Sequence, residues 1–166
     1  MINSYTIRRA RPEEAERLTE IAHAAKRYWN YPDLWIKAWH NDLTFTIDFI
    51  RANLVYAAVG ADDTPVACYA LAREGTDFEL EHLWVEPSVI GFGLGRALFS
   101  HAVRTAQSYG GDTLFIVSDP NAEAFYQRMG AKRIGVVRAD VCGEQRELPR
   151  MQFDLLLTKT TSVFEE

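Results

Sequence analysis

Two carboxylates, Glu79 and Glu81, lie two residues apart in the stretch 78–85, which reads FELEHLWV. These residue types favour a β-strand, and alternate side chains of a strand point to the same face. The two carboxylates therefore share one face, where either could take a proton from a substrate as a general base. The simpler alternative is that both are solvated or ion-paired strand residues.

A glycine-rich turn follows this strand. Pro87 stops the strand ladder because it has no amide hydrogen, and Gly91, Gly93 and Gly95 come next. Glycines leave no Cβ atom between the backbone and a ligand, and they permit backbone angles that other residues avoid. A helix that begins here would present unpaired amides and the positive end of its dipole. The turn is therefore suited to a phosphate or pyrophosphate, unless the glycines only mark the start of the helix.

Two familiar phosphate-binding patterns fit this turn poorly. No Lys-Ser or Lys-Thr follows the glycines, so the nucleoside-triphosphate loop is absent. The dinucleotide pattern GxGxxG fails because the spacing here is GxGxG. Asp119 nevertheless closes the next expected strand, where a ribose-binding acid would sit. A nucleotide-binding oxidoreductase fragment stays as a weaker alternative.

A third pattern fits better. Val85 and Pro87, the glycines at 91, 93 and 95, and Leu98 follow the order V-x-P, then G-x-G-x-G-x-x-L. This run resembles the acetyl-CoA-binding core motif of the GNAT superfamily of N-acetyltransferases. One position departs from the family, which usually places Gln or Arg where this chain has Ile90. In the family that position acts largely through its backbone amide.

A second stretch, NAEAFYQRMGAKRIG, begins at Asn121. It resembles the GNAT segment on the helix beside the cofactor thiol, with Phe125, Tyr126 and Gly130 at the family's spacing. Two motifs in the correct order are much more specific than either alone. The resemblance covers nearly the whole chain, which is expected to form one domain over residues 1–166 with a core at about 5–157.

The resemblance implies that the chain transfers the acetyl group of acetyl-CoA to a primary amine of a small molecule or protein by direct attack. A glutamate would be the base, Tyr126 the acid that protonates the leaving thiolate, and an amide near Val85 the oxyanion donor. Glu79 aligns with the family's glutamate and Glu81 lies nearer the cofactor, so both stay candidates. The implied cofactor-binding residues are Leu83, Trp84, Val85, Ile90, Gly91, Phe92, Gly93, Leu94, Gly95, Arg96, Asn121 and Phe125.

The stretch 28–40, YWNYPDLWIKAWH, is rich in aromatic residues. Trp35 and Trp39 are four residues apart, so they would share one face of a short helix. Packing of the helices onto the sheet is one interpretation. The other follows from the resemblance, since the segment between the first two helices lines the acceptor site in such families. It makes Trp29, Tyr31 and Trp35 candidate acceptor residues.

The order of elements predicts an α/β fold with a mixed sheet. Helices come first, then a meander of three strands, then helices alternating with strands. The resemblance adds a mostly antiparallel central sheet flanked by helices, with a splayed strand pair at the cofactor site. Thr44 and Asn121 are expected to cap helices that end near residues 53 and 129. The last two strands are expected at 132–141 and 150–157, joined by a polar loop.

Composition excludes several classes of protein. Of the 166 residues 48% are hydrophobic, and the formal charge of −5 without a basic cluster argues against nucleic-acid binding. The apolar stretches are too short for a membrane helix and the N-terminus does not read as a signal peptide, so we expect a cytoplasmic protein. Cys68, Cys142 and the scattered histidines suggest buried thiols and no metal site. A non-catalytic acyl-CoA sensor or scaffold of the same fold is the alternative function, and a homodimer is possible.

Overall fold

The computed structural model describes residues 4–157. The strands are β1 (Thr6–Arg9), β2 (Leu54–Val59), β3 (Pro65–Glu74), β4 (Asp77–Val85), β5 (Thr113–Val117), β6 (Lys132–Val141) and β7 (Glu144–Asp154). The α-helices are α1 (Ala15–Arg27), α2 (Asp33–Ala38), α3 (Ile47–Ala52), α4 (Leu94–Ser108) and α5 (Glu123–Arg128). Three short 3₁₀ helices are η1 (Pro12–Glu14), η2 (Pro87–Val89) and η3 (Pro120–Ala122).

The described strands form a seven-stranded sheet in the order β1-β2-β3-β4-β5-β7-β6. β1 pairs antiparallel with β2, and β7 pairs antiparallel with both β5 and β6. β4 and β5 are parallel, and α4 connects them along the chain, as a parallel crossover requires. The mixed, mostly antiparallel sheet confirms the fold class expected from the sequence.

The chain divides into two compact units. In the first, which holds described residues 4–70 and 82–98, α1 packs its apolar face into a hydrophobic core. Leu18, Ile21 and Ala22 are fully buried there with Phe45 and Val55. Their spacing on α1 is the i, i+3, i+4 pattern of a half-buried helix, as the sequence predicts.

The second unit holds residues 71–81 and 99–157, and its core is built around Phe99 of α4. The Phe99 ring lies 5.8 Å from that of Tyr126 and 5.6 Å from that of Phe153. α4 ends because Gly110 takes a φ of 77°, and a Cβ on the next residue, Gly111, would come within 2.8 Å of Phe78. The Gly110-Gly111 pair therefore both ends the helix and permits close packing.

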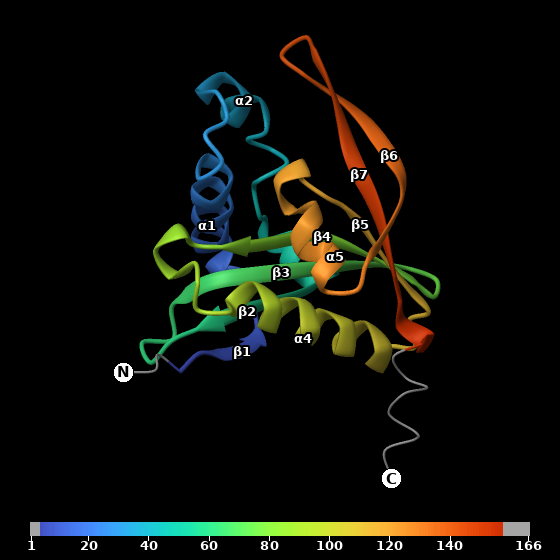
Figure 1. Ribbon diagram of the computed structural model, residues 1–166. Coiled ribbons are helices and arrows are strands. Elements are labelled where there is room, and N and C mark those ends of the chain that lie inside the picture. Colours follow the sequence, from blue (N-terminus) through green and yellow to red (C-terminus); the bar gives the residue numbers. More distant parts are fainter. Residues whose placement is uncertain (1–3, 158–166) are drawn as a thin grey trace. The chain divides into compact units, whose positions relative to one another are not determined.

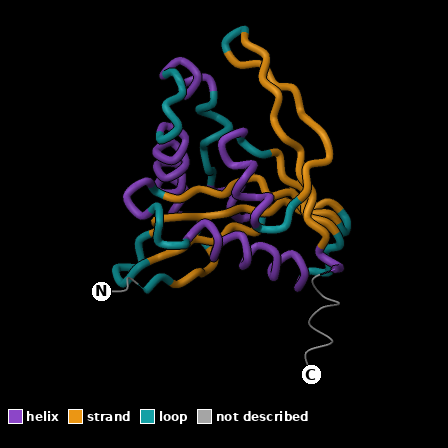
Figure 2. Tube along the Cα trace, viewed as in Figure 1, coloured by secondary structure: helices purple, strands orange, loops and turns teal. Residues whose placement is uncertain are grey.

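The prediction of a polar loop at residues 142–149 is wrong, because most of this stretch belongs to β7. β6 and β7 form a long hairpin whose turn is only Cys142 and Gly143, with φ values of 49° and 81°. Figure 1 shows the two strands as a twisted ribbon, and Figure 2 shows strand on both sides up to the turn. Charged residues and Pro149 suggested a loop, but strand pairing from Val141↔Glu144 to Val136↔Pro149 overrides those local preferences. Cys142 is exposed at the turn, so its expected burial is wrong, whereas Cys68 is buried.

β7 also ends earlier than expected. Its last residue is Asp154, and the Asp154 carboxylate accepts hydrogen bonds from the amides of Leu156 and Leu157 at 2.9 and 3.3 Å. This arrangement turns the backbone out of the strand, as aspartate side chains commonly do.

Two helix caps lie at positions other than those expected. Thr46, not Thr44, caps α3 by accepting a hydrogen bond from the amide of Phe49, while the Thr44 hydroxyl donates to the carbonyl of His40. Asp119 caps the turn before α5, and Asn121 lies inside that turn. In both places two capping residues stand two positions apart, and sequence alone did not separate them.

Candidate active site

The strands β4 and β5 are paired over only part of their length. Their parallel register runs Asp77↔Thr113, Phe78↔Leu114 and Glu79↔Phe115 and then ends, although β4 continues to Val85 and β5 to Val117. β5 meanwhile keeps its pairing with β7 as far as Val117↔Arg150. The strands therefore separate directly after Glu79, which agrees with the splayed pair that the family resemblance implies.

Glu79 lies at the last paired position and is held by an arginine. Its Oε1 accepts a hydrogen bond from Nη2 of Arg150 at 2.7 Å, and both side chains are about one-third exposed, at 33% and 30%. The Arg150 guanidinium also lies 4.7 Å from the centre of the Phe115 ring. The Arg150 guanidinium therefore binds the Glu79 carboxyl group and at the same time packs on the Phe115 ring.

Glu81 lies two residues further along β4, on the same face and beyond the end of the ladder. Glu81 is exposed as a whole residue, yet partial desolvation of its carboxyl group raises its pKa, and the nearby charge of Glu79 raises it further. Among residues 4–157 no ion pair involves Glu81. Its environment therefore favours the protonated form more than that of a solvated glutamate does.

Tyr126 sits in the first turns of α5 with its ring between Phe99 and Phe125, and only 7% of the residue is exposed. Burial raises the pKa of its phenol, and the charge of Asp119 adds to this effect. Within the described part of the chain the hydroxyl makes no hydrogen bond, and it is not among the fully buried unpaired polar atoms. The phenol is therefore a protonated donor whose oxygen still reaches solvent.

Asn121 stands at the entry to α5 and is exposed. Its amide nitrogen and its side-chain Nδ2 both donate to Oδ1 of Asp119, at 2.9 and 3.0 Å. Asp119 thus orients Asn121, and the proposed alternative of a ribose-binding acid is disfavoured because this carboxylate serves as a cap. Phe125, the other predicted residue of this motif, packs against Phe99 and Tyr126.

In the first unit the glycine turn has the features of an anion site. Gly91 and Gly93 have φ values of 92° and 77°, which L side chains rarely adopt, and both face open space. Leu94 starts α4 and anchors it, being 5% exposed, while Ile90 and Phe92 are exposed. From Gly91 onward, Ala97 is the first described residue whose backbone amide donates a hydrogen bond. Its acceptor is the carbonyl oxygen of Gly93, at 3.0 Å.

The amides of residues 91–96 are six consecutive donors without a partner in the described part of the chain. At a helix N-terminus such donors add to the positive end of the helix dipole, and Arg96 contributes a full charge nearby. The turn can therefore bind a pyrophosphate through its backbone.

The last residues of β4, directly before this turn, include His82 and Trp84, whose rings contact each other and neighbouring aromatic side chains. Trp84 Nε1 donates to Nδ1 of His82 at 2.9 Å, and the His82 ring lies 4.4 Å from that of Phe45. Burial lowers the pKa of His82 to about 4. His82 is therefore a neutral ring held by packing, and its Nδ1 is paired with the indole nitrogen of half-buried Trp84. Leu83 and Val85 alternate with them and are half-buried.

The aromatic stretch forms a packed cluster with one residue left apart. Tyr31 stacks on Trp35 at 5.8 Å, Trp39 meets both rings edge-on, and the ammonium group of Lys26 lies 4.4 Å from the centre of the Trp39 ring. The predicted contact of Trp35 with Trp39 is confirmed at 5.7 Å. Trp29 contacts the Tyr28 ring and is 42% exposed. Packing thus accounts for most of the cluster, whereas the rings of Trp29 and of Tyr28, which is 50% exposed, stay open to a ligand.

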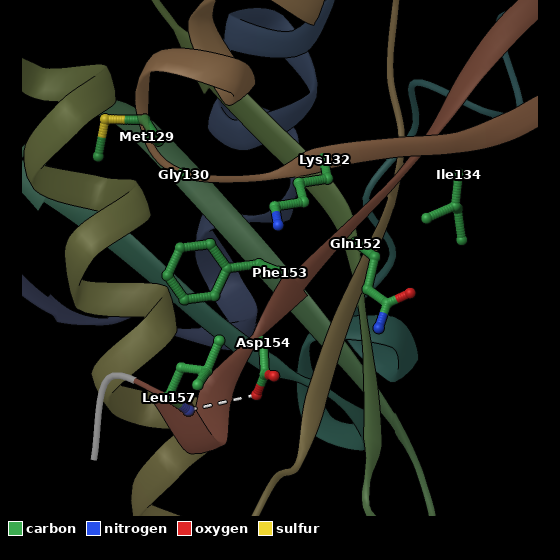
Figure 3. A pocket seen from close by; sticks show the side chains of 8 residues that line it. All are labelled: Met129, Gly130, Lys132, Ile134, Gln152, Phe153, Asp154 and Leu157. Atoms are coloured by element: carbon green, nitrogen blue, oxygen red, sulfur yellow. Dashed lines mark hydrogen bonds between the residues drawn. The ribbon is translucent and has the colours of Figure 1, made fainter. Parts of the chain in front are cut away.

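A pocket of about 490 Å³ in the second unit lies elsewhere. It is lined by Met129, Lys132, Phe153 and Leu157 among others, and Figure 3 shows the Lys132 side chain beside the Phe153 ring. None of the residues predicted for catalysis or cofactor binding lines it. Within residues 4–157 no group of three or more His, Cys, Asp or Glu side chains could hold a metal, and no helix there is long and apolar enough to cross a membrane.

Sequence reasoning missed Arg150 as a partner of Glu79 and Asp119 as the residue that orients Asn121. The partner of Arg150 depends on the register of β5 with β7, which no local pattern specifies. Asp119, directly before Pro120, carried a usable signal, since Asp before Pro commonly caps a turn.

Comparison with known proteins agrees with the sequence motifs. The family model described as the acetyltransferase (GNAT) family matches residues 15–131. The peptidyl-lysine N-acetyltransferase YjaB of Salmonella typhimurium is 31% identical over 147 residues, which cover 87% of this chain and 92% of the relative. Its namesake from Escherichia coli is 28% identical, covering 89% and 96%.

Solved structures share the fold. A GCN5-related N-acetyltransferase from Rhodopseudomonas palustris superposes with a TM-score of 0.77 at 21% identity, covering 93% of this chain and 98% of that one. The PaiA N-acetyltransferase of Thermoplasma acidophilum, solved in complex with coenzyme A, gives a TM-score of 0.70 at 19% identity, covering 91% and 99%.

Proposed function

Because the chain belongs to the GNAT acetyltransferase family, and is thus an acetyl-CoA-dependent acetyltransferase, we propose that it acetylates the side-chain amine of lysine in a peptide or protein. The observation that carries the cofactor half of this proposal is the run of six unpartnered amides at residues 91–96. The acceptor half is supported by the relative at 31% identity, whose name is that of a peptidyl-lysine N-acetyltransferase.

The residues of the chain fit coenzyme A. A pyrophosphate needs several convergent donors, and the amides from Gly91 to Arg96 offer them without a Cβ in the way at the two positive-φ glycines. A pantetheine arm carries amide groups that can form hydrogen bonds with a strand backbone. The backbone of β4 beyond Glu79 is not paired with β5, so its amide and carbonyl groups on that side could bind the arm. Bound acetyl-CoA supplies an activated acetyl thioester. Asn121 would hydrogen-bond the arm, and Phe125 would pack beside it.

Glu81 is our choice for the base. A lysine ammonium must lose a proton before its nitrogen can attack, and Glu81 is the unpaired carboxylate with the raised pKa. The Glu79 carboxyl group is bound by the Arg150 guanidinium at 2.7 Å. Glu79 therefore acts on the charge of the site and not as the proton acceptor.

Tyr126 is our choice for the acid. Its phenol stays protonated at neutral pH because burial raises its pKa, and its hydroxyl has no competing partner among the described residues. Donation of this proton to a departing thiolate would lower the barrier to breaking the thioester. An amide near Val85 would steady the oxyanion, since β4 there has left the ladder with β5.

Acceptor binding would involve the exposed face of Trp29, with Tyr31 and Trp35 shaping the surface behind it. Aromatic faces attract ammonium groups, and the cluster already holds Lys26 in this way.

Two matched glycine variants test the cofactor half. Gly93→Ala and Gly143→Ala impose the same strain, since their φ values are 77° and 81° and both face open space. Both should lose about 1 kcal/mol or more of stability. Only Gly93→Ala should weaken acetyl-CoA binding, measured by calorimetry. Equal affinity in the two variants would remove the turn from the cofactor site.

A further inference from the structure

The side chain of Arg150 crosses a whole strand to reach its partner. Arg150 on β7 is in register with Val117 of β5, whereas Glu79 on β4 is in register with Phe115, two residues earlier on β5. The guanidinium reaches back over the Phe115 ring, at 4.7 Å, to meet Glu79 at 2.7 Å. It thus ties β7 to β4 at the last position before β4 and β5 separate.

The pair alters the charge that Glu81 experiences. Glu79 and Glu81 are two carboxylates on one face of one strand, and a nearby like charge disfavours ionisation of the second. By Coulomb's law the positive charge of Arg150, whose Nη2 lies 2.7 Å from Oε1 of Glu79, opposes this repulsion. The other charged groups near these strands are few. Asp77 lies further along the same face of β4, and Lys132 of β6 is paired in register with the neutral Gln152 of β7. The β5 residues in this register carry no charge: Thr113, Phe115 and Val117.

We propose that Arg150 is a positioning residue for acetyl transfer, which binds Glu79, offsets its charge beside Glu81 and thereby sets the pH range in which Glu81 takes up a proton. The proposal rests on the function proposed above. It assigns a different task to each of the two carboxylates that the sequence left equivalent.

Removing the two partners singly has opposite consequences. Arg150→Gln leaves Glu79 as an uncompensated neighbour, so the acid limb of kcat/KM should move to higher pH by about half to one unit. Glu79→Gln removes the like charge and leaves Arg150 uncompensated, so the limb should move to lower pH by a similar amount. The double variant should return toward the wild-type limb.

Two further variants separate charge from packing. Arg150→Lys keeps the charge but loses the flat contact with Phe115, so it should retain the wild-type limb even where it lowers stability. Arg138→Gln breaks the exposed pair of Arg138 with Glu147, 3.9 Å apart on the hairpin, and should leave the limb unchanged.

The decisive measurement has a readout that does not need turnover. The carboxyl carbon of Glu81 is titrated by NMR in the unliganded protein and its Arg150→Gln and Glu79→Gln variants, alongside the pH profiles. Shifts of opposite sign support the proposal. Shifts of the same sign, or lost activity with an unmoved titration, would overturn it and leave Arg150 a structural residue. Opposite shifts without any acetyl transfer would instead refute the proposed function and retain the electrostatic coupling.

Discussion

Glu81 lies two residues beyond Glu79 on the same face of β4, but only Glu79 is held by an arginine, at 2.7 Å from Arg150. The ladder between β4 and β5 ends between the two carboxylates. Glu79 is therefore the last paired residue of β4, and Glu81 lies in the unpaired part. The alternation of the sequence does not reveal this difference, on which we base the choice of Glu81 as the proposed base.

The first prediction concerns the base. Glu81→Gln should lower kcat by about 10²-fold or more, the usual contribution of a general base, with little change in stability. Because the pKa of Glu81 is raised, wild-type activity should fall as the pH drops through a value above the ordinary glutamate range. Steady-state kinetics over a pH series measure both effects. If Glu79→Gln costs more kcat than Glu81→Gln, the assignment is reversed.

The second prediction concerns the acid. Tyr126→Phe keeps the ring that packs on Phe99 but removes the hydroxyl, so the free energy of unfolding should change by less than about 1 kcal/mol. Turnover should fall by about 10-fold or more while acetyl-CoA affinity stays the same. Tyr109→Phe removes the phenol of an exposed tyrosine directly after α4, which makes it a matched control. Full turnover by Tyr126→Phe would exclude the phenol as acid.

The third prediction separates acceptor contact from packing. Trp29→Ala should raise the KM for the acceptor with little loss of stability, because Trp29 is 42% exposed and packs only on the Tyr28 ring among the contacts described. Trp35→Ala should instead destabilise the protein by about 2 kcal/mol or more, since it opens the cluster with Tyr31 and Trp39. An unchanged KM in Trp29→Ala would remove that ring from the acceptor site.

The fourth prediction concerns stability at acid pH. The pKa of His82 is about 4 in the folded state against an ordinary value of 6.5, so the unfolded chain binds a proton first as the pH falls. Stability is therefore complete above about 6.5 and should fall by up to about 3 kcal/mol as the pH drops to 4. His82→Gln keeps an acceptor for Trp84 and should flatten this part of the stability curve.

Urea unfolding at a series of pH values tests the prediction. His23, whose pKa is also lowered by burial, provides the comparison through His23→Gln. An equally steep pH dependence in His82→Gln and the wild-type protein would contradict the account of the buried ring.

The elements that local chemistry specifies were predictable from the sequence. The turn from Pro87 to Gly95 and the stop at Gly110 depend on backbone angles that glycine and proline alone favour, and the structure has both. Helix α1 follows from its apolar period in the same way. The same local signals carried the cofactor motif.

The errors arose where tertiary pairing decides the outcome. The long hairpin of β6 and β7 contains charged residues and Pro149, which read as a loop until its cross-strand partners are known. Arg150 and Glu79 are 71 residues apart, so their pairing depends on the order β4-β5-β7 and on the register within it. A one-residue slip of β7 would have turned Arg150 to the opposite face.

The most direct test of the whole account is to identify the atom that receives the acetyl group. The protein is incubated with acetyl-CoA and a library of lysine-containing peptides with free N-termini, and the products are mapped by tandem mass spectrometry beside the Glu81→Gln variant. We predict acetyl groups on lysine side-chain nitrogens, at a rate reduced about 10²-fold in the variant. Acetylation confined to N-terminal amines, or binding of acetyl-CoA with no acetylated peptide at all, would contradict the account.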